Sequence, residues 1–421
     1  MPWLGPSVCT AMTSRRPLPL LVNLQHLMFD GSEICLPFFG PKLSRLSAVD
    51  LAGTSPVNFI PSIKTLAPNL EHLSISGFAK SARTICEVVC SLHHLRSLDM
   101  IDIPLTSACI THLSALPNLR QLSATITADS HVQTGFSCNR FPALVELELS
   151  ANSWPLVIAF LKAYVQDLPL RDFSCTVEQV PTPEHLDQLF DTLRKYLPNS
   201  LRGIVLPRPL HWNYPPALPV LNPNSIRRLL TFPDLEKLAI LTPISFEDVD
   251  NTLIGEIASA WPRLTSLEFP CFSLFTPRTK VTVCGLRPLA DQCANLGKLS
   301  IGLDPAVPDT HVRLKPDGTS YDTSLSSFVV GYSPIKDPVA VASFLADVFP
   351  NLHKVDAWDN RKRSYREMVE GSDDYLWDKV NTLYRDLVAG RRQERLHTSQ
   401  SMESQTLKLD FDDAGDCLCC A

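Results

Sequence analysis

The chain lacks the motifs that mark the common enzyme and nucleotide-binding sites. It contains no GxGxxG or GxxxxGK[ST] loop, no HExxH pair and no GxSxG turn. Those motifs cradle phosphates, hold zinc and present a nucleophile, respectively. Its one CxxC, Cys417 to Cys420, has no second pair with which to build a structural zinc site. We therefore expect a protein that is not an enzyme, with no catalytic residues, no cofactor and no metal.

Long apolar runs and an excess of positive charge are also missing. The chain has no uninterrupted apolar run of the roughly 18 residues that a transmembrane helix requires. Lys and Arg number 38 against 44 Asp and Glu, a net charge of −6, which argues against general affinity for nucleic acid. Residues 1–21 contain four prolines and a Thr-Ser-Arg-Arg break, a poor secretory signal. We expect no transmembrane segment and no nucleic-acid partner.

The cysteines point to a reducing compartment. There are thirteen, an odd number, which favours free thiols in the cytoplasm or the nucleus. Cys86, Cys90 and Cys109 stand among helical apolar residues, where free cysteine acts as a small hydrophobe. The terminal cluster Cys417, Cys419 and Cys420 misses the prenylation spacing. Reversible acylation of this cluster and a flexible tail without a role both stay open.

What the chain does contain is one phrase repeated thirteen times: a leucine, two residues, an apolar residue, one residue and a further apolar residue. Leu70/Leu73/Ile75 and Leu144/Leu147/Leu149 are two examples, and the second repeat is assigned to Leu46/Val49/Leu51. The last two apolar positions stand two apart, so both leave a strand on the same face. Pro-x-Leu precedes six of the phrases, because proline ends the preceding helix and favours extended chain.

Several phrases are followed by segments with helical spacing. The clearest cover 81–94, 184–196, 246–260 and, at the end, 375–389. Alternating strands and helices at a fixed period predict an α/β leucine-rich-repeat solenoid, a horseshoe with a parallel inner sheet and outer helices. We expect an N-terminal extension over 1–20, about 13 repeats over 21–360, a capping helix within 361–390, and a polar, disordered tail over 391–421.

A stacked array offers a long surface rather than a catalytic pocket. If the apolar residues point inward, the alternating strand positions line the concave face. Through the first seven repeats these positions are predicted to hold acids and no Lys or Arg. His26 and His72 also face this surface, but two histidines two repeats apart do not make a metal site. We predict a partner-binding face made of Asp50, Asp99, Glu146, Glu148, Asp172, Lys298, Lys354 and Trp358. The alternative is a solvated polar face that keeps the array soluble.

Three stretches carry a resemblance to a known family. They are Ala67-Pro-Asn-Leu70-Glu-His-Leu73, Leu116-Pro-Asn-Leu119-Arg-Gln-Leu122 and Phe349-Pro-Asn-Leu352-His-Lys-Val355. These stretches, with the C-terminal Trp377-Asp-Lys-Val380, resemble the repeats and ending of F-box/leucine-rich-repeat proteins of mushroom-forming fungi. In that family the repeats hold a substrate, and an N-terminal F-box joins them to a cullin-type ubiquitin ligase. About twenty residues precede the first repeat here, too few for an F-box.

The resemblance therefore implies a protein-binding module that recognises substrates for an F-box-like ubiquitin-ligase adaptor. Cullin-type ligase subunits are expected as partners only if an F-box lies upstream. The alternative is a leucine-rich-repeat scaffold or inhibitor that works without the ligase.

Overall fold

The computed structural model describes residues 19–29, 33–49, 59–130, 141–165, 168–197, 200–209, 218–271, 279–305, 321, 323–357, 372–373, 375–391 and 393. The chain folds into two compact units, unit 1 over Met1–Asp248 and unit 2 over Val249–Ala421.

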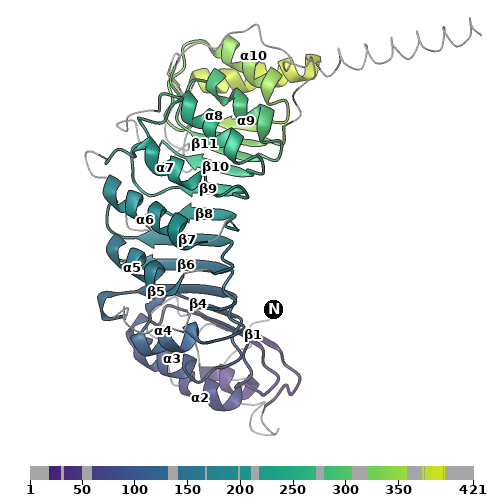
Figure 1. Ribbon diagram of the computed structural model, residues 1–421. Coiled ribbons are helices and arrows are strands. Elements are labelled where there is room, and N and C mark those ends of the chain that lie inside the picture. The colour runs from purple at the N-terminus through teal and green to yellow at the C-terminus, as the bar shows by residue number, and fades with distance from the viewer. Residues whose placement is uncertain are drawn as a thin grey trace, which may run out of the picture. The chain divides into compact units, whose positions relative to one another are not determined.

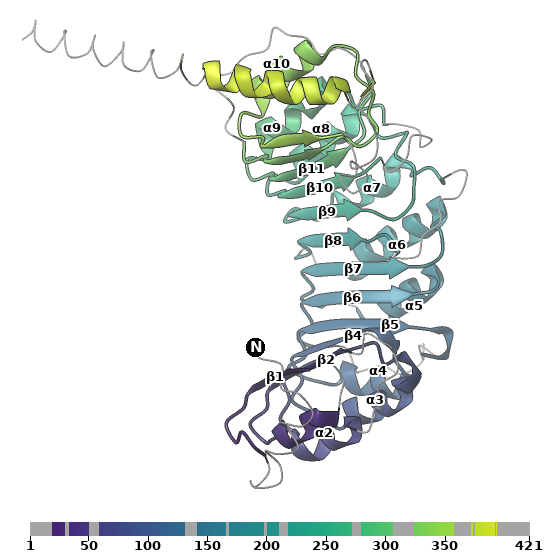
Figure 2. The ribbon, with the colours of Figure 1, turned by 180° about the vertical axis from the view of Figure 1, so that it is seen from behind.

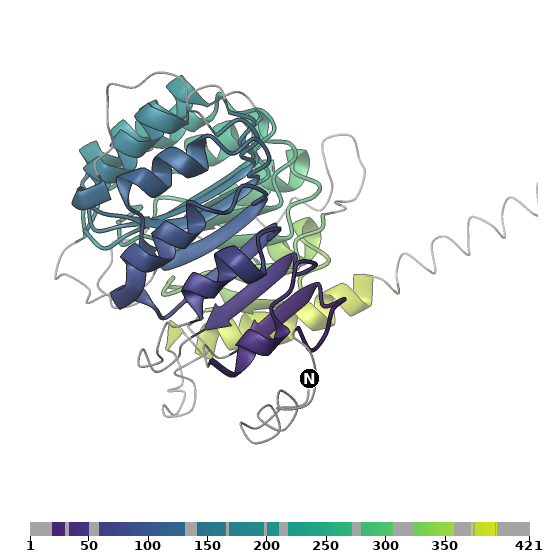
Figure 3. The same ribbon diagram turned by 90° about the horizontal axis from the view of Figure 1, so that it is seen from below.

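Unit 1 is a parallel sheet whose strands follow one another in chain order, each paired with the next. The strands are β1 (His26–Phe29), β2 (Arg45–Val49), β3 (His72–Ser76), β4 (Ser97–Pro104), β5 (Gln121–Ile126), β6 (Glu146–Ala151), β7 (Asp172–Val177), β8 (Gly203–Leu206) and β9 (Lys237–Ile240). The connections hold α2 (Ile60–Leu66), α3 (Ala82–Val89), α4 (Ser107–Ser114), α5 (Trp154–Tyr164), α6 (Pro183–Tyr196) and α7 (Pro223–Leu229), with short 3-10 turns at Glu33–Phe38, Ala79–Ser81 and Ala128–Ser130. Figures 1 and 3 show these helices as a layer along one side of the sheet.

Unit 2 continues the same alternation. Its strands β10 (Ser266–Phe269), β11 (Lys298–Ile301), β12 (Ser327–Val329) and β13 (Lys354–Asp356) are parallel and sequential. Its helices are α8 (Asn251–Ala260), α9 (Arg287–Gln292) with a 3-10 turn at Cys284–Leu286, and α10 (Pro338–Val348). Strand and helix alternate in each unit, so the predicted α/β leucine-rich-repeat fold is confirmed.

The core lies between the sheet and the helices. In each unit the middle apolar residues of the phrases are aligned across neighbouring strands, as in Leu147↔Phe173 of unit 1 and Leu267↔Leu299 of unit 2. Leu98, Leu122 and Leu147 are almost completely buried, and each such side chain stabilises the fold by about 1.5–3 kcal/mol. One repeat cannot bury this surface alone, and stacking buries it against both neighbours.

The second repeat has a different register from the predicted one. Leu46 is aligned with Leu27 on β1 and with Leu73 on β3, so it occupies the middle apolar position and not the first. The assignment to Leu46/Val49/Leu51 was wrong by three residues, and Ala48 is fully buried. The Pro-x-Leu signature, present here as Pro41-Lys42-Leu43, marks the observed register.

The predicted helices are present, with ends set by local capping. Helix α6 begins after Thr182, whose hydroxyl accepts a hydrogen bond from the His185 N–H (3.3 Å), while His185 Nδ1 accepts one from the Thr182 N–H (3.2 Å). This reciprocal pair satisfies two donors that a helix start leaves free. Helix α8 begins at Asn251 and not at the predicted Phe246, because the Asp250 side chain accepts from the Leu253 N–H (2.9 Å).

A helix over 375–391 covers the last strand of unit 2, as Figure 2 shows in yellow. The amide side chain of Asn381 accepts from the Val355 N–H (2.8 Å) and donates to the Val355 carbonyl (2.9 Å). It thereby satisfies backbone groups on the open edge of β13. Tyr384 Oη accepts from the Leu352 N–H (3.0 Å) and donates to the Phe349 carbonyl (2.8 Å), and Trp377 Nε1 donates to Ser333 (2.8 Å). Helix side chains here replace the pairing that a further strand would supply.

Candidate functional site

The polar face of the sheet in unit 1 brings four of the predicted acids together. Strand pairing aligns Gln121, Glu146, Asp172, Gly203 and Lys237 in one row across β5 to β9. A second row, two residues further along, holds Ser74, Asp99, Ser123 and Glu148 across β3 to β6. Adjacent strands lie about 4.8 Å apart. We call Asp99, Glu146, Glu148 and Asp172 the acidic strip.

Three carboxylates of the acidic strip are oriented by a donor on the preceding strand. Gln121 Nε2 donates to Glu146 Oε2 (2.8 Å), Ser123 Oγ donates to Glu148 Oε2 (3.1 Å), and Ser74 Oγ donates to Asp99 Oδ2 (3.0 Å).

Each carboxylate can accept several further hydrogen bonds. Within the described residues none of the four acids forms an ion pair. Asp99, Glu146 and Asp172 are exposed and Glu148 is half-buried, so the acidic strip presents free acceptors to a partner.

Asp172 lies in surroundings that disfavour its charged form. Partial burial raises its pKa above the ordinary value, and the negative charges of Glu146 and Glu236 raise it further. Lys237 and Arg202 oppose this effect in part. The carboxylate lies over Gly203 on the next strand, where a Cβ atom would stand 2.3 Å from Oδ1. A cationic group bound here would relieve the repulsion among the acids.

The predicted residue Asp50 lies outside the described residues. The face positions of β2 are Arg45, Ser47 and Val49, as the pairing with β1 and β3 requires. The expectation that the first seven repeats place no Lys or Arg on this face was therefore wrong, because Arg45 is exposed there. His26 and His72 are aligned with it on the neighbouring strands. Burial, followed by the charge of Arg45, lowers the pKa of His72.

The predicted cations lie in unit 2, and each is paired with an acid of its own face. Lys298 Nζ is 2.7 Å from Glu268 Oε2, and Glu268 is 8% exposed. Lys354 Nζ is 2.5 Å from Asp356 Oδ1 on the same strand. Trp358 lies outside the described residues. Both lysines therefore already have a carboxylate partner on the face of unit 2.

Sequence reasoning missed a line of arginines beside the acidic strip. Arg96, Arg120, Arg171 and Arg202 each precede the first face residue of their strand, and we call them the arginine rim. Their carbonyls accept two successive N–H groups from the next repeat, as Arg120 does from Val145 and Glu146. Arg96 pairs with Glu71 (3.0 Å), and Arg202 pairs with Glu236 (3.2 Å). The signal was visible in the sequence, because each arginine directly follows the first leucine of its phrase.

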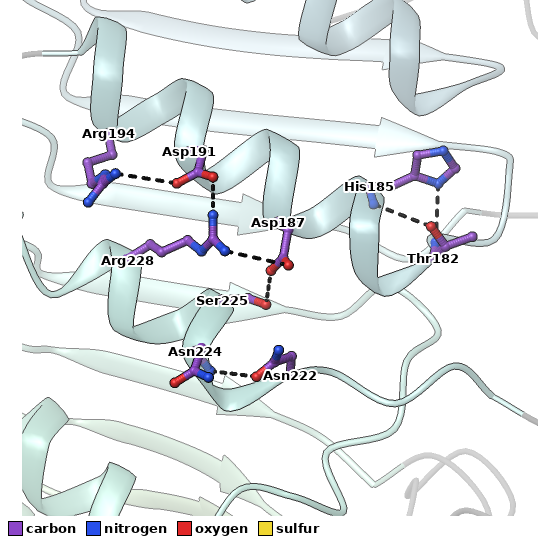
Figure 4. Close-up of polar contacts among 9 residues, drawn as sticks. All are labelled: Thr182, His185, Asp187, Asp191, Arg194, Asn222, Asn224, Ser225 and Arg228. Carbon is purple, nitrogen blue, oxygen red and sulfur yellow. Dashed lines mark hydrogen bonds and ion pairs between the residues drawn. The ribbon is translucent and has the colours of Figure 1, made fainter.

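A second polar cluster, between α6 and α7, has its charges satisfied within the cluster (Figure 4). Arg228 on α7 contacts Asp191 and lies 3.6 Å from Asp187, both on α6. Asp187 also accepts a hydrogen bond from Ser225, and Arg194 lies 3.6 Å from Asp191. Since acids and bases are paired with one another, this cluster fastens two consecutive helices and offers little to a ligand.

The described residues contain no group of three or more His, Cys, Asp and Glu side chains that could hold a metal ion. None of their helices combines the length and the apolar character needed to cross a membrane.

The fold is that of a leucine-rich-repeat protein, and comparisons with known proteins add little to it. No family model matches the chain, and no curated protein matches it. Among solved structures it is similar to one described as "Crystal structure of Rad7 and Elc1 complex in yeast", with 15% sequence identity and a TM-score of 0.41. The match covers 87% of this chain and 86% of that one.

Proposed function

We propose that this protein is a non-enzymatic protein-binding module whose acidic strip receives a basic segment of a partner protein. The observation that carries the proposal is that Glu146 and Glu148 are held in place by hydrogen bonds but have no cation paired with them in the described part of the chain. Each is held by a donor from β5, and neither has a cation beside it among the described residues. A partner that brings Lys or Arg to these groups gains charge-assisted hydrogen bonds without reorganising the face.

The crowding of like charges around Asp172 supports the same partner chemistry. Glu146 and Glu236 both raise the pKa of the Asp172 carboxyl, so the unbound face stores a repulsion that a bound cation removes. The arginine rim limits which partners fit. A long polyanion would meet the acids beside the rim, and a purely basic surface would meet the rim itself. The partner we propose carries basic side chains bordered by acidic ones, which favours specificity as well as attraction.

We further propose that the module selects substrates for an F-box-like ubiquitin-ligase adaptor in the cytoplasm or nucleus. The resemblance of the Pro-Asn-Leu phrases to F-box/leucine-rich-repeat proteins supports this part. Under this proposal the polar face holds the substrate, and a separate segment recruits cullin-type subunits.

The test is affinity purification of the tagged full-length transcript product, with any segment encoded upstream of Met1, from cells that express it natively, beside the variant Glu146→Lys/Glu148→Lys. Recovery of cullin-type subunits with both chains, together with proteins that only the unaltered chain captures, is the expected result. If the variant fails to capture proteins that the unaltered chain captures, and neither chain recovers cullin subunits, the adaptor part of the proposal is overturned and a ligase-independent scaffold remains. An identical set of proteins on both chains would overturn the role of the acidic strip.

A further inference from the structure

The first three strands of unit 1 carry a row of basic side chains on the polar face of the sheet. Strand pairing aligns His26 of β1, Arg45 of β2 and His72 of β3. Neighbouring strands lie about 4.8 Å apart, and these side chains leave the sheet on the face opposite to the buried Leu46. We call His26, Arg45 and His72 the basic row.

Arg45 is the permanent cation of the basic row, and its charge has no partner within the described chain. Its side chain is exposed, and it takes part in none of the ion pairs among the described residues. Glu71, the acid beside His72, is already paired with Arg96 (3.0 Å). The guanidinium of Arg45 therefore offers N–H donors in a planar fork whose geometry matches a carboxylate.

The histidines make the charge of the basic row depend on pH. The charged groups that face His72 from its own and the neighbouring strands are His26, Arg45, Glu71, Arg96 and Asp99. Burial, followed by the positive charge of Arg45, lowers the pKa of His72. A bound anion favours the protonated imidazole, so anion binding and proton uptake by His72 are expected to support one another.

An exposed apolar side chain lies beside the basic row. Met28 follows His26 by two residues on β1, so both project from the same face of the sheet. Met28 is 72% exposed, the most exposed large apolar side chain of the described chain. Methionine adapts its shape to a partner, and apolar contacts bordered by polar groups are typical of protein interfaces.

We propose that the basic row binds an acidic segment of a partner protein, with a carboxylate between Arg45 and His72 and an apolar side chain on Met28. This inference rests on the proposed function, because the same partner places its basic side chains on the acidic strip. A nucleic acid fits less well, since its charged backbone would continue from the basic row onto carboxylates of the same face.

The distance between the two surfaces sets the spacing of charges in the partner. Arg45 on β2 and Glu146 on β6 stand in one row of the sheet, four strand spacings apart. Four spacings are about 19 Å, which an extended chain crosses in roughly six residues. The partner segment is therefore expected to carry an acid and a base about six residues apart and to lie across the strands in one orientation.

The test uses the full chain and four fluorescent peptides. The parent peptide has a leucine beside two glutamates, a spacer of roughly five uncharged residues, and two lysines. The second has glutamines in place of the glutamates, the third has glutamines in place of the lysines, and the fourth has a spacer of about half the length. Fluorescence anisotropy at low salt measures each affinity at about pH 6 and about pH 7.5.

The two glutamates should raise the affinity of the unaltered protein by roughly tenfold. The gain should be larger at the lower pH, where His72 carries a proton, and smaller with the short spacer. It should vanish in Arg45→Gln/His72→Gln. Arg83→Gln is the matched control, because it removes an exposed arginine of α3 outside this face, and it should keep the full gain. The comparison of the first two peptides on the unaltered protein does not depend on either variant.

The outcomes separate this inference from the proposed function. Affinity that depends on the lysines and not on the glutamates would keep the acidic strip and overturn the basic row. Affinity that depends on the glutamates and not on the lysines would support the basic row and overturn the acidic strip. A gain from the glutamates that survives Arg45→Gln/His72→Gln, or no binding of the parent peptide at roughly millimolar concentration, would overturn the inference.

Discussion

The carboxylate of Asp172 on β7 occupies the space above Gly203 on β8, where a Cβ atom would stand 2.3 Å from Asp172 Oδ1. The absence of a side chain at position 203 lets this acid lie across its neighbouring strand. The position of the Asp172 carboxylate therefore depends on the absence of a Cβ atom at position 203.

The effect of Gly203→Ala on stability is expected to depend on the residue at position 172: destabilising beside Asp172 and stabilising beside alanine. In the unaltered protein Gly203→Ala forces the carboxylate out of its rotamer, a cost of about 1 kcal/mol. In an Asp172→Ala background the clash is gone, and Gly203→Ala should stabilise by about 0.4–1 kcal/mol because it restricts the unfolded chain. A double-mutant cycle by urea unfolding measures the coupling. Equal effects in the two backgrounds would mean that the two residues do not interact.

The raised pKa of Asp172 makes a prediction about pH. A carboxyl with a higher pKa in the folded than in the unfolded state is favoured in its protonated form by folding. Its ionisation therefore costs stability as pH rises from the ordinary Asp value through the folded value. Asp172→Asn should be more stable than the unaltered protein at neutral pH, and the difference should shrink as pH falls through that window. Thermal melting across pH checks this, and a constant difference at every pH would contradict it.

Asn381 is expected to hold the last strand of unit 2 in place. Asn381→Ala removes both hydrogen bonds to Val355 and leaves buried backbone groups without partners, a loss of about 2–4 kcal/mol. Hydrogen exchange at the Val355 amide should accelerate. Thr382→Ala is the control, because Thr382 is exposed and bonds only within its helix. Similar exchange rates in the two variants would show that Asn381 does not seal this edge.

The cluster in Figure 4 predicts a difference between arginine and lysine. Arg228→Ala leaves Asp187 and Asp191 without their shared cation and should destabilise by about 1–2 kcal/mol. Arg228→Lys should recover only part of this, since lysine has one nitrogen where the guanidinium offers a separate one to each carboxylate. Arg194→Ala should cost less than about 0.5 kcal/mol, because that pair is largely exposed. Full rescue by lysine, measured by urea unfolding, would contradict the forked geometry.

The sequence predicts this fold well because the same apolar pattern recurs many times along the chain. The one error in register, at Leu46, arose where two overlapping phrases both fit the pattern, and only Pro41-Lys42-Leu43 separates them. Alternation along a strand also places Glu146 and Glu148 on the polar face, because successive side chains leave on opposite faces.

Contacts between repeats were harder to predict than positions within one. The pairing of Lys298 with Glu268 depends on how the side chains reach across strands. The arginine rim lies at a position where the chain is not yet a strand, so alternation does not describe it.

The most direct test of the central claim is capture of partner proteins at low and at physiological salt by three chains. These are the unaltered protein, Glu146→Lys/Glu148→Lys, and Glu87→Lys/Glu184→Lys, which makes the same change in net charge on helices α3 and α6. We predict that the first double variant loses roughly tenfold or more in affinity at low salt, with a smaller loss at physiological salt, where charges are screened beyond about 8 Å. The helix variant should bind as the unaltered protein does. Equal binding by all three chains would contradict the acidic strip as the binding surface.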